Sequence, residues 1–111
     1  MIPFIIITLD KPYECRLGYR ESLAYQQITG KSLAEIQEVG LDNVAGLLCA
    51  MLRKHDQSLT VESVEQLIDE HVDSISALIG LVAACVDAAY NLDKQNPNVK
   101  TLAAIKRLPI I

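Results

Sequence analysis

The hydrophobic and polar positions at the start of the chain have the patterns of two β-strands. Residues 4–9 form a continuous run that is mostly apolar and rich in β-branched side chains, and residues 13–17 alternate between apolar and polar. Residues 10–12, Asp-Lys-Pro, have turn chemistry. The pattern predicts a β-hairpin with three side chains on one face, those of Tyr13, Cys15 and Leu17. Since a lone hairpin is barely stable in water, it must pack against a helix or a partner chain.

Helical spacing begins after Gly18. Residues 19–29 contain no Gly or Pro, and Gly30 is placed to end this helix in the left-handed conformation. Ser32 and Glu35 form an S-x-x-E capping box, which predicts a short helix ending near Gly40. The apolar stripe expected on the first helix consists of Tyr19, Leu23, Ala24 and Ile28.

Three longer helices are expected after residue 41. Asp42 is placed to cap the first of them, and its basic end, residues 53–55, complements the negative end of the helix dipole. Thr60 caps the second, which is apolar on one side and acidic on the other. The third, residues 74–92, is non-polar on two sides, which predicts that it is buried or docks against a partner. We expect this last helix to be the centre of the fold.

These elements predict a helix-dominated α+β fold, with an N-terminal hairpin packed on about four to five helices. A chain of 111 residues suits one domain, which we place at residues 1–93. Residues 94–111 form a C-terminal tail that contains the structure-breaking sequence Asn-Pro-Asn at 96–98 and, from residue 99, basic but no acidic residues. The tail is either a frayed terminus or a segment that becomes ordered on a partner.

Composition excludes several classes of protein. A net charge of −4, with basic residues scattered among acidic ones, argues against direct binding of DNA or RNA. The longest uncharged apolar run, residues 75–86, is too short to cross a bilayer. Three cysteines without a secretion signal are typical of a reducing cytoplasm.

Candidate chemistry is sparse. His55 and His71 lie on different predicted helices without metal-ligand spacing, so we expect no metal site and no cofactor. Cys49 and Cys85 fall on apolar stretches and are expected to be buried rather than catalytic. The acidic residues between 62 and 73 are either a solvated face or a docking surface for a basic partner. Gly46 and Gly80 inside helices indicate close helix packing, with each other as one option. We expect no catalytic residues and no enzymatic activity.

The order of core and turn residues over about residues 5–90 resembles the small tail assembly chaperones of long-tailed phages, prophages and gene-transfer-agent clusters. The segments that carry this resemblance are ITLDKPY at 7–13, CRLGYR at 15–20, ITGKSL at 28–33, LLCAML at 47–52, LTVESV at 59–64 and LIDE at 67–70.

The resemblance implies a non-enzymatic role in virion assembly. Such chaperones bind the tape-measure protein, keep its hydrophobic helices from aggregating and help to recruit tail-tube subunits. They act in the cytoplasm of the host bacterium and are absent from the mature virion. The alternative is another small helical interaction module, such as a virion structural component, an adaptor or a regulator.

Apolar surface left on the last helix also predicts a binding role from the residues themselves, because another polypeptide must cover it. A helix of a partner protein, or a second copy of the chain in a homo-oligomer, would cover this surface. The residues that we expect near this contact are Ile75, Leu78, Leu81, Val82 and Ala84.

Overall fold

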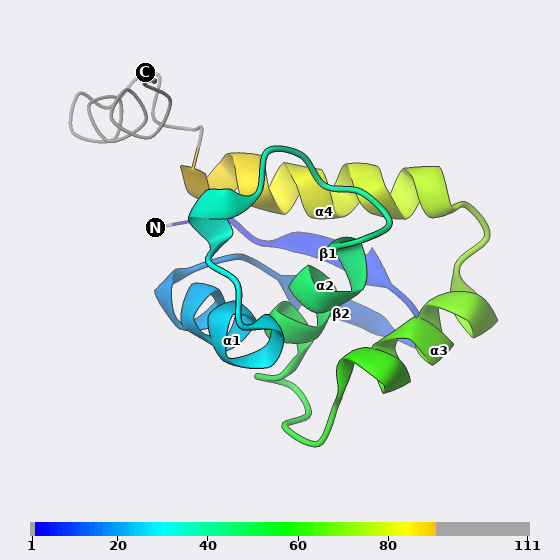
Figure 1. The fold of residues 1–111 in the computed structure, drawn as a ribbon. Coiled ribbons are helices and arrows are strands. Elements are labelled where there is room, and N and C mark those ends of the chain that lie inside the picture. Colours follow the sequence, from blue (N-terminus) through cyan, green and yellow to red (C-terminus); the bar gives the residue numbers. More distant parts are fainter. Residues whose placement is uncertain (1, 91–111) are drawn as a thin grey trace.

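The computed structural model describes residues 2–90, which form the predicted hairpin followed by helices (Figure 1). In chain order the elements are β1 (Ile5–Thr8), β2 (Pro12–Cys15), α1 (Tyr19–Thr29), the 3-10 helix η1 (Leu33–Glu35), α2 (Val44–Leu52), α3 (Val61–His71) and α4 (Ile75–Tyr90). The expected helix-dominated α+β class is confirmed. The tail expected at 94–111, and the domain boundary before it, lie outside the described residues.

The hairpin packs its inner face against two helices. β1 and β2 are antiparallel, with Ile7 opposite Tyr13. Tyr13, Cys15 and Leu17 are all buried, as predicted, whereas Ile6 on the other face of β1 is exposed. Because β1 contacts α4 and β2 contacts α2, the hairpin does not stand alone.

α2, and not α4, is the centre of the fold. Every residue of α2 is buried, and the helix contacts α1, α3, α4 and β2 (Figure 1). Its sequence, VAGLLCAML, contains no charged or strongly polar side chain, so a core has to surround it. The expectation that the helix predicted at residues 74–92 is central is therefore wrong. The second side of α4 consists mostly of small residues, and small residues lose little when they stay in water.

α1 is rotated relative to its predicted apolar stripe. Tyr19 is 79% exposed and Leu23 is 42% exposed, whereas Glu21 and Tyr25 are buried. A hydrogen bond explains the burial of the acid, because the Gly18 N–H donates to Glu21 Oε1 at 2.9 Å. This contact satisfies a backbone donor at the helix start and turns the Glu21–Tyr25 side of the helix toward the core.

The two helical glycines do not pack against each other. A Cβ on Gly46 would lie 3.0 Å from Thr29 Cγ2 and 3.4 Å from Tyr25 Cε1, so this glycine lets α1 approach α2 closely. A Cβ on Gly80 would meet no atom within 4 Å. Close packing thus explains Gly46 but not Gly80, and the option that the two glycines pack against each other is wrong.

Two predicted helix ends are confirmed. Gly30 follows α1 with φ of 74°, in the left-handed region where glycine has no Cβ penalty. Thr60 caps α3: its side-chain oxygen accepts from the Ser63 N–H at 3.1 Å, and the Thr60 N–H donates to Ser63 Oγ at 2.8 Å.

The short helix expected between Ser32 and Gly40 is only one 3-10 turn, η1. Ser32 Oγ accepts from the Ala34 N–H at 3.1 Å, two residues ahead, and not from the third residue as a capping box requires. The bonds that continue the turn also have 3-10 spacing, from Glu35 N–H to Ser32 O and from Ile36 N–H to Leu33 O.

The residue before α2 is Asn43, and not the predicted Asp42. Its amide side chain makes no cap. Instead, its Oδ1 accepts from the Gly40 N–H and its Nδ2 donates to Glu38 O, both at 2.9 Å. Asn43 therefore ties the loop of residues 38–43 together at the start of the central helix.

Candidate interaction surface

α4 divides into a buried side and an exposed side. Its core side chains are Leu78, Val82 and Cys85. Four exposed residues at helical spacing lie on the opposite side, and we call them the α4 outer face: Ala77, Gly80, Leu81 and Ala84. Leu81, at 39% exposed, is the large side chain among them.

The five residues expected near a partner contact are split by this arrangement. Leu78 and Val82 belong to the core, being 3% and 0% exposed, so a partner cannot reach them unless the fold opens. Leu81 and Ala84 lie on the outer face. Ile75 is 39% exposed in the first turn of α4, on a different side of the helix.

The outer face is nearly free of charge. Asp87 is the one charged residue within α4. The exposed side of α3, in contrast, carries a run of carboxylates, those of Glu62, Glu65, Asp69 and Glu70. An exposed helix side with little charge, in a domain whose α3 is acidic on its exposed side, is the candidate surface for an apolar partner.

Large apolar side chains are also exposed outside α4, among them Tyr19 and Leu23, which lie four residues apart on one side of α1. Leu41 is 77% exposed in the loop before α2. The ring of Phe4 is partly covered by two cations, because Arg16 Cζ lies 5.1 Å and Lys54 Nζ 4.5 Å from its centroid. These contacts join residues far apart in the sequence, and no spacing pattern predicts them.

A polar groove of about 540 Å³ lies where the end of α1, η1 and the starts of α2 and α3 meet. Its lining includes the carboxylates of Glu35, Glu38, Asp42 and Glu65 and the side chain of Lys31. The groove was not predicted, because its residues come from separate elements that only the tertiary fold brings together. Its acidic lining differs in character from the α4 outer face.

His55 joins the end of α2 to the hairpin. Its Nε2 lies 3.0 Å from the Glu14 carbonyl oxygen, and its ring packs edge-on against Tyr13 with the centroids 5.5 Å apart. The His55 side chain is therefore held by the hairpin through both its Nε2 atom and its ring.

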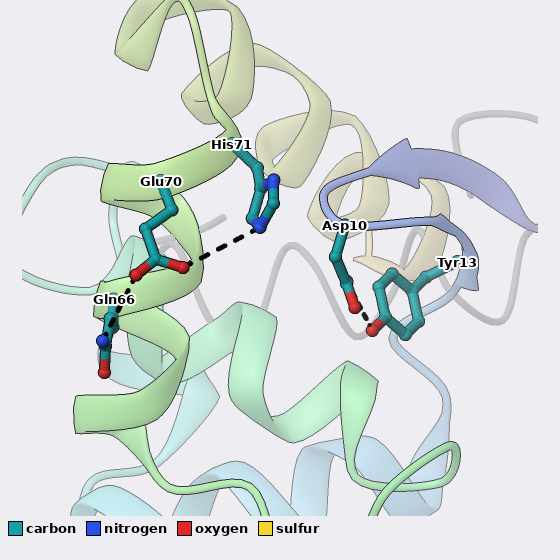
Figure 2. A network of polar contacts seen from close by, with 5 residues as sticks. All are labelled: Asp10, Tyr13, Gln66, Glu70 and His71. Carbon is teal, nitrogen blue, oxygen red and sulfur yellow. Dashed lines mark hydrogen bonds and ion pairs between the residues drawn. The ribbon is translucent and has the colours of Figure 1, made fainter.

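His71, the last residue of α3, lies near Asp10 of the hairpin turn (Figure 2). At the turn, the Tyr13 hydroxyl donates to Asp10 Oδ1 at 2.8 Å, and this bond lowers the pKa of Asp10. The His71 ring nitrogen lies 3.9 Å from Glu70 at the end of α3. In the described residues, His, Cys, Asp and Glu side chains form no group of three that would hold a metal ion.

The three thiols are buried and not nucleophilic. Burial raises the pKa of Cys15 to about 12, and the neighbouring Cys85 thiol adds to this rise. Burial likewise raises the pKa of Cys85 to about 11 and raises that of Cys49. Since the thiolate is the reactive form, these cysteines act as small hydrophobic residues, as the sequence predicts for Cys49 and Cys85.

We therefore expect the native protein to react slowly with a thiol reagent. At pH 8 the three cysteines should be modified at least about tenfold more slowly than in the protein unfolded by guanidinium chloride, because they are both covered and protonated. Absorbance during reaction with dithionitrobenzoate measures the rate. Fast modification of one thiol in the native state would show that this cysteine is accessible.

Within residues 2–90, none of the helices combines the length and apolar character needed to cross a lipid bilayer. The chain matches no protein-family model, no curated protein and no solved structure. Its function therefore has to be inferred from its own residues.

Proposed function

We propose that the protein is a non-enzymatic chaperone of phage tail assembly that binds the tape-measure protein through the α4 outer face. The observation that carries the proposal is this exposed, uncharged helix side in a domain whose other long surface helix, α3, is strongly acidic. The resemblance of residues 5–90 to tail assembly chaperones supports the choice of partner. In this role the protein also helps to recruit tail-tube subunits, and it acts in the cytoplasm of the host bacterium.

The shape of the outer face suits a helical partner. Ala77, Gly80 and Ala84 are small, and the space above Gly80 is open, so the backbone of a second helix can approach closely. Leu81 offers a side chain that inserts between residues of that helix. An apolar helix laid along such a face is a common mode of peptide recognition, and a tape-measure protein rich in apolar helices presents many such segments.

Co-expression tests the proposal. The tape-measure protein encoded downstream should stay soluble and co-purify with the wild-type chain. Leu81→Asp should lower the affinity at least about tenfold, because a carboxylate would be buried without a partner in the interface. Helicity by circular dichroism should remain unchanged, since Leu81 is exposed in the free protein.

Leu41→Asp is the matched control, because it makes the same change at an exposed leucine that does not belong to the α4 outer face, and it should bind like the wild type. A tape-measure protein that remains insoluble with the wild-type chain would contradict the chaperone role. Equal binding by Leu81→Asp and Leu41→Asp would show that the α4 outer face is not part of the binding interface. Loss of helicity in Leu81→Asp would assign Leu81 to the core.

A further inference from the structure

The hairpin has two edges, and the edge of β2 is covered. Glu14 of β2 lies opposite Ile6 of β1. The Glu14 carbonyl oxygen lies 3.0 Å from His55 Nε2 at the end of α2, so this carbonyl points away from β1 and already has a partner. The free edge of the hairpin is therefore that of β1.

The backbone groups on the edge of β1 belong to Phe4, Ile6 and Thr8. Across the turn, the Leu9 N–H donates to the Lys11 carbonyl at 3.0 Å and so points toward β2. Because the direction of these groups alternates along an antiparallel strand, those of residues 5 and 7 also face β2, and those of Phe4, Ile6 and Thr8 face outward. Within residues 2–90, none of the backbone hydrogen bonds outside the ladder uses these outward groups. All three residues are exposed.

The helix layer over the hairpin is wider than the hairpin itself. α4 approaches from the inner face, since Cys85 neighbours the buried Cys15, and it runs alongside β1 while α2 contacts β2 (Figure 1). Neighbouring helix axes lie about 8–10 Å apart, whereas neighbouring strands lie about 4.8 Å apart. Two helices therefore cover more than two strands, and α4 can cover a third strand beside β1.

Two cations at the start of this edge have no carboxylate partner. Continued pairing of β1 with β2 places Arg16 opposite Phe4. Arg16 Cζ lies 5.1 Å and Lys54 Nζ 4.5 Å from the centroid of the Phe4 ring. Within residues 2–90, no carboxylate is close enough to either cation to form an ion pair, and the buried Arg16 Nε has no hydrogen-bond partner. A carboxylate beside Phe4 would offset the repulsion between these like charges.

From these observations we propose that the edge of β1 binds an extended segment of another polypeptide as a third strand, with an acidic residue of that segment beside Phe4. Backbone hydrogen bonds to Phe4, Ile6 and Thr8 hold the segment, as in other cases of strand addition. Alternate side chains of the segment lie beneath α4 and are apolar, and the others lie beside Phe4 and Ile6. This site is separate from the α4 outer face.

A second copy of β1 fits this edge less well. Antiparallel pairing of two β1 strands around Ile6 places Thr8 of the second copy opposite Phe4. No carboxylate then comes beside the two cations, and the next acidic residue along that strand, Asp10, already accepts the Tyr13 hydroxyl. Charge therefore favours a different polypeptide with an acidic residue within the added strand.

NMR titration with a short synthetic peptide, blocked at both ends, tests the strand addition. The peptide alternates threonine and valine, with one glutamate among the threonines, and a second peptide has glutamine in its place. At saturation the glutamate peptide should slow hydrogen exchange of the Ile6 and Thr8 amides by at least about tenfold. The glutamine peptide should bind at least about threefold more weakly. Absence of binding by both peptides at about 1 mM would overturn the proposal.

Ile6→Pro tests the backbone contact. It removes the outward N–H without removing a bond of the β1–β2 ladder, and edge strands tolerate proline. The variant should bind the glutamate peptide at least about tenfold more weakly than the wild type. Ile6→Ala is the matched control, because it removes the side chain and keeps the N–H, and it should bind within about threefold of the wild type. Equal binding by the two variants would contradict strand addition.

Lys54→Gln gives a readout that leaves the β1 backbone unchanged. It should reduce the preference for the glutamate peptide over the glutamine peptide by at least about half, because one of the two cations is lost. An undiminished preference would place the acidic residue elsewhere and overturn the proposal.

The protein without any peptide shows whether the edge is free. The Ile6 amide should exchange rapidly at all protein concentrations. Slow exchange that disappears on dilution would identify a second copy as the occupant, and slow exchange that persists would identify another segment of the same chain. Either result would overturn the proposal.

Discussion

Leu48→Ala should lower the free energy of unfolding by about 2–5 kcal/mol, the usual cost of a cavity at a fully buried leucine. Leu48 is fully buried in α2, and helices on several sides hold the neighbouring atoms in place, so the core cannot collapse into the space. Leu81→Ala should change the same free energy by less than about 1 kcal/mol, because Leu81 is exposed and alanine favours helix.

Chemical denaturation followed by circular dichroism measures both changes. The contrast between the two leucines matters more than either value, since both lie within apolar helices and undergo the same substitution. Similar losses at Leu48 and Leu81 would contradict a core centred on α2 with α4 at the surface.

Alkaline pH should destabilise the protein from about pH 9 upward, because a buried thiol must lose its proton when the chain unfolds. Burial raises the pKa of Cys15 from its ordinary value of 9.0 to about 12, so the folded state keeps a proton that the unfolded state loses. The stabilisation from this thiol is complete below pH 9 and is lost as the pH rises toward 12. Between pH 8 and 10.5 Cys15 alone should cost on the order of 2 kcal/mol.

Cys85 and Tyr13 act in the same direction, because burial raises the pKa of Cys85 to about 11 and that of Tyr13 from 10.0 to about 12. The test is the difference between the free energies of unfolding at pH 8 and pH 10.5. Cys15→Ala lowers stability at both pH values through its cavity, but it should shrink that difference by about 2 kcal/mol. An unchanged difference would show that Cys15 is not the group that titrates.

Much of the secondary structure follows from local sequence. The hairpin over residues 4–17, the end of α1 at Gly30 and the cap of α3 at Thr60 were all predicted correctly. Each depends on neighbours along the chain: alternating side chains, a glycine that tolerates positive φ, and a hydroxyl within reach of a backbone N–H. The S-x-x-E sequence at Ser32 did not produce a longer helix, because the Ser32 side chain accepts from the second N–H and not the third, and the next backbone hydrogen bonds have 3-10 spacing.

The buried side of α3 followed from local sequence, because its predicted apolar side carries the buried Val64 and Ile68, but the buried sides of α1 and α4 did not. α1 turns Glu21 and Tyr25 inward and exposes Tyr19, because the backbone contact at Gly18 and the space above Gly46 lie on that side. For α4 the sequence predicts two non-polar sides without ranking them. Only the positions of β1 and α2 decide that Leu78 and Val82 are core and that Leu81 is surface.

The sequence by itself therefore determined the hairpin, the helices after it, and the presence of more apolar helix surface than one core would cover. The tertiary structure decided that α2 is the centre, that the α4 outer face is the part left exposed, and that the acidic groove exists. The physical reason is that periodicity and capping depend on neighbours along the chain, whereas the burial of a side chain depends on which other elements of the fold pack against it. Nine consecutive residues without charge in α2 are surrounded on every side, and the small residues of α4 can remain in water at little cost.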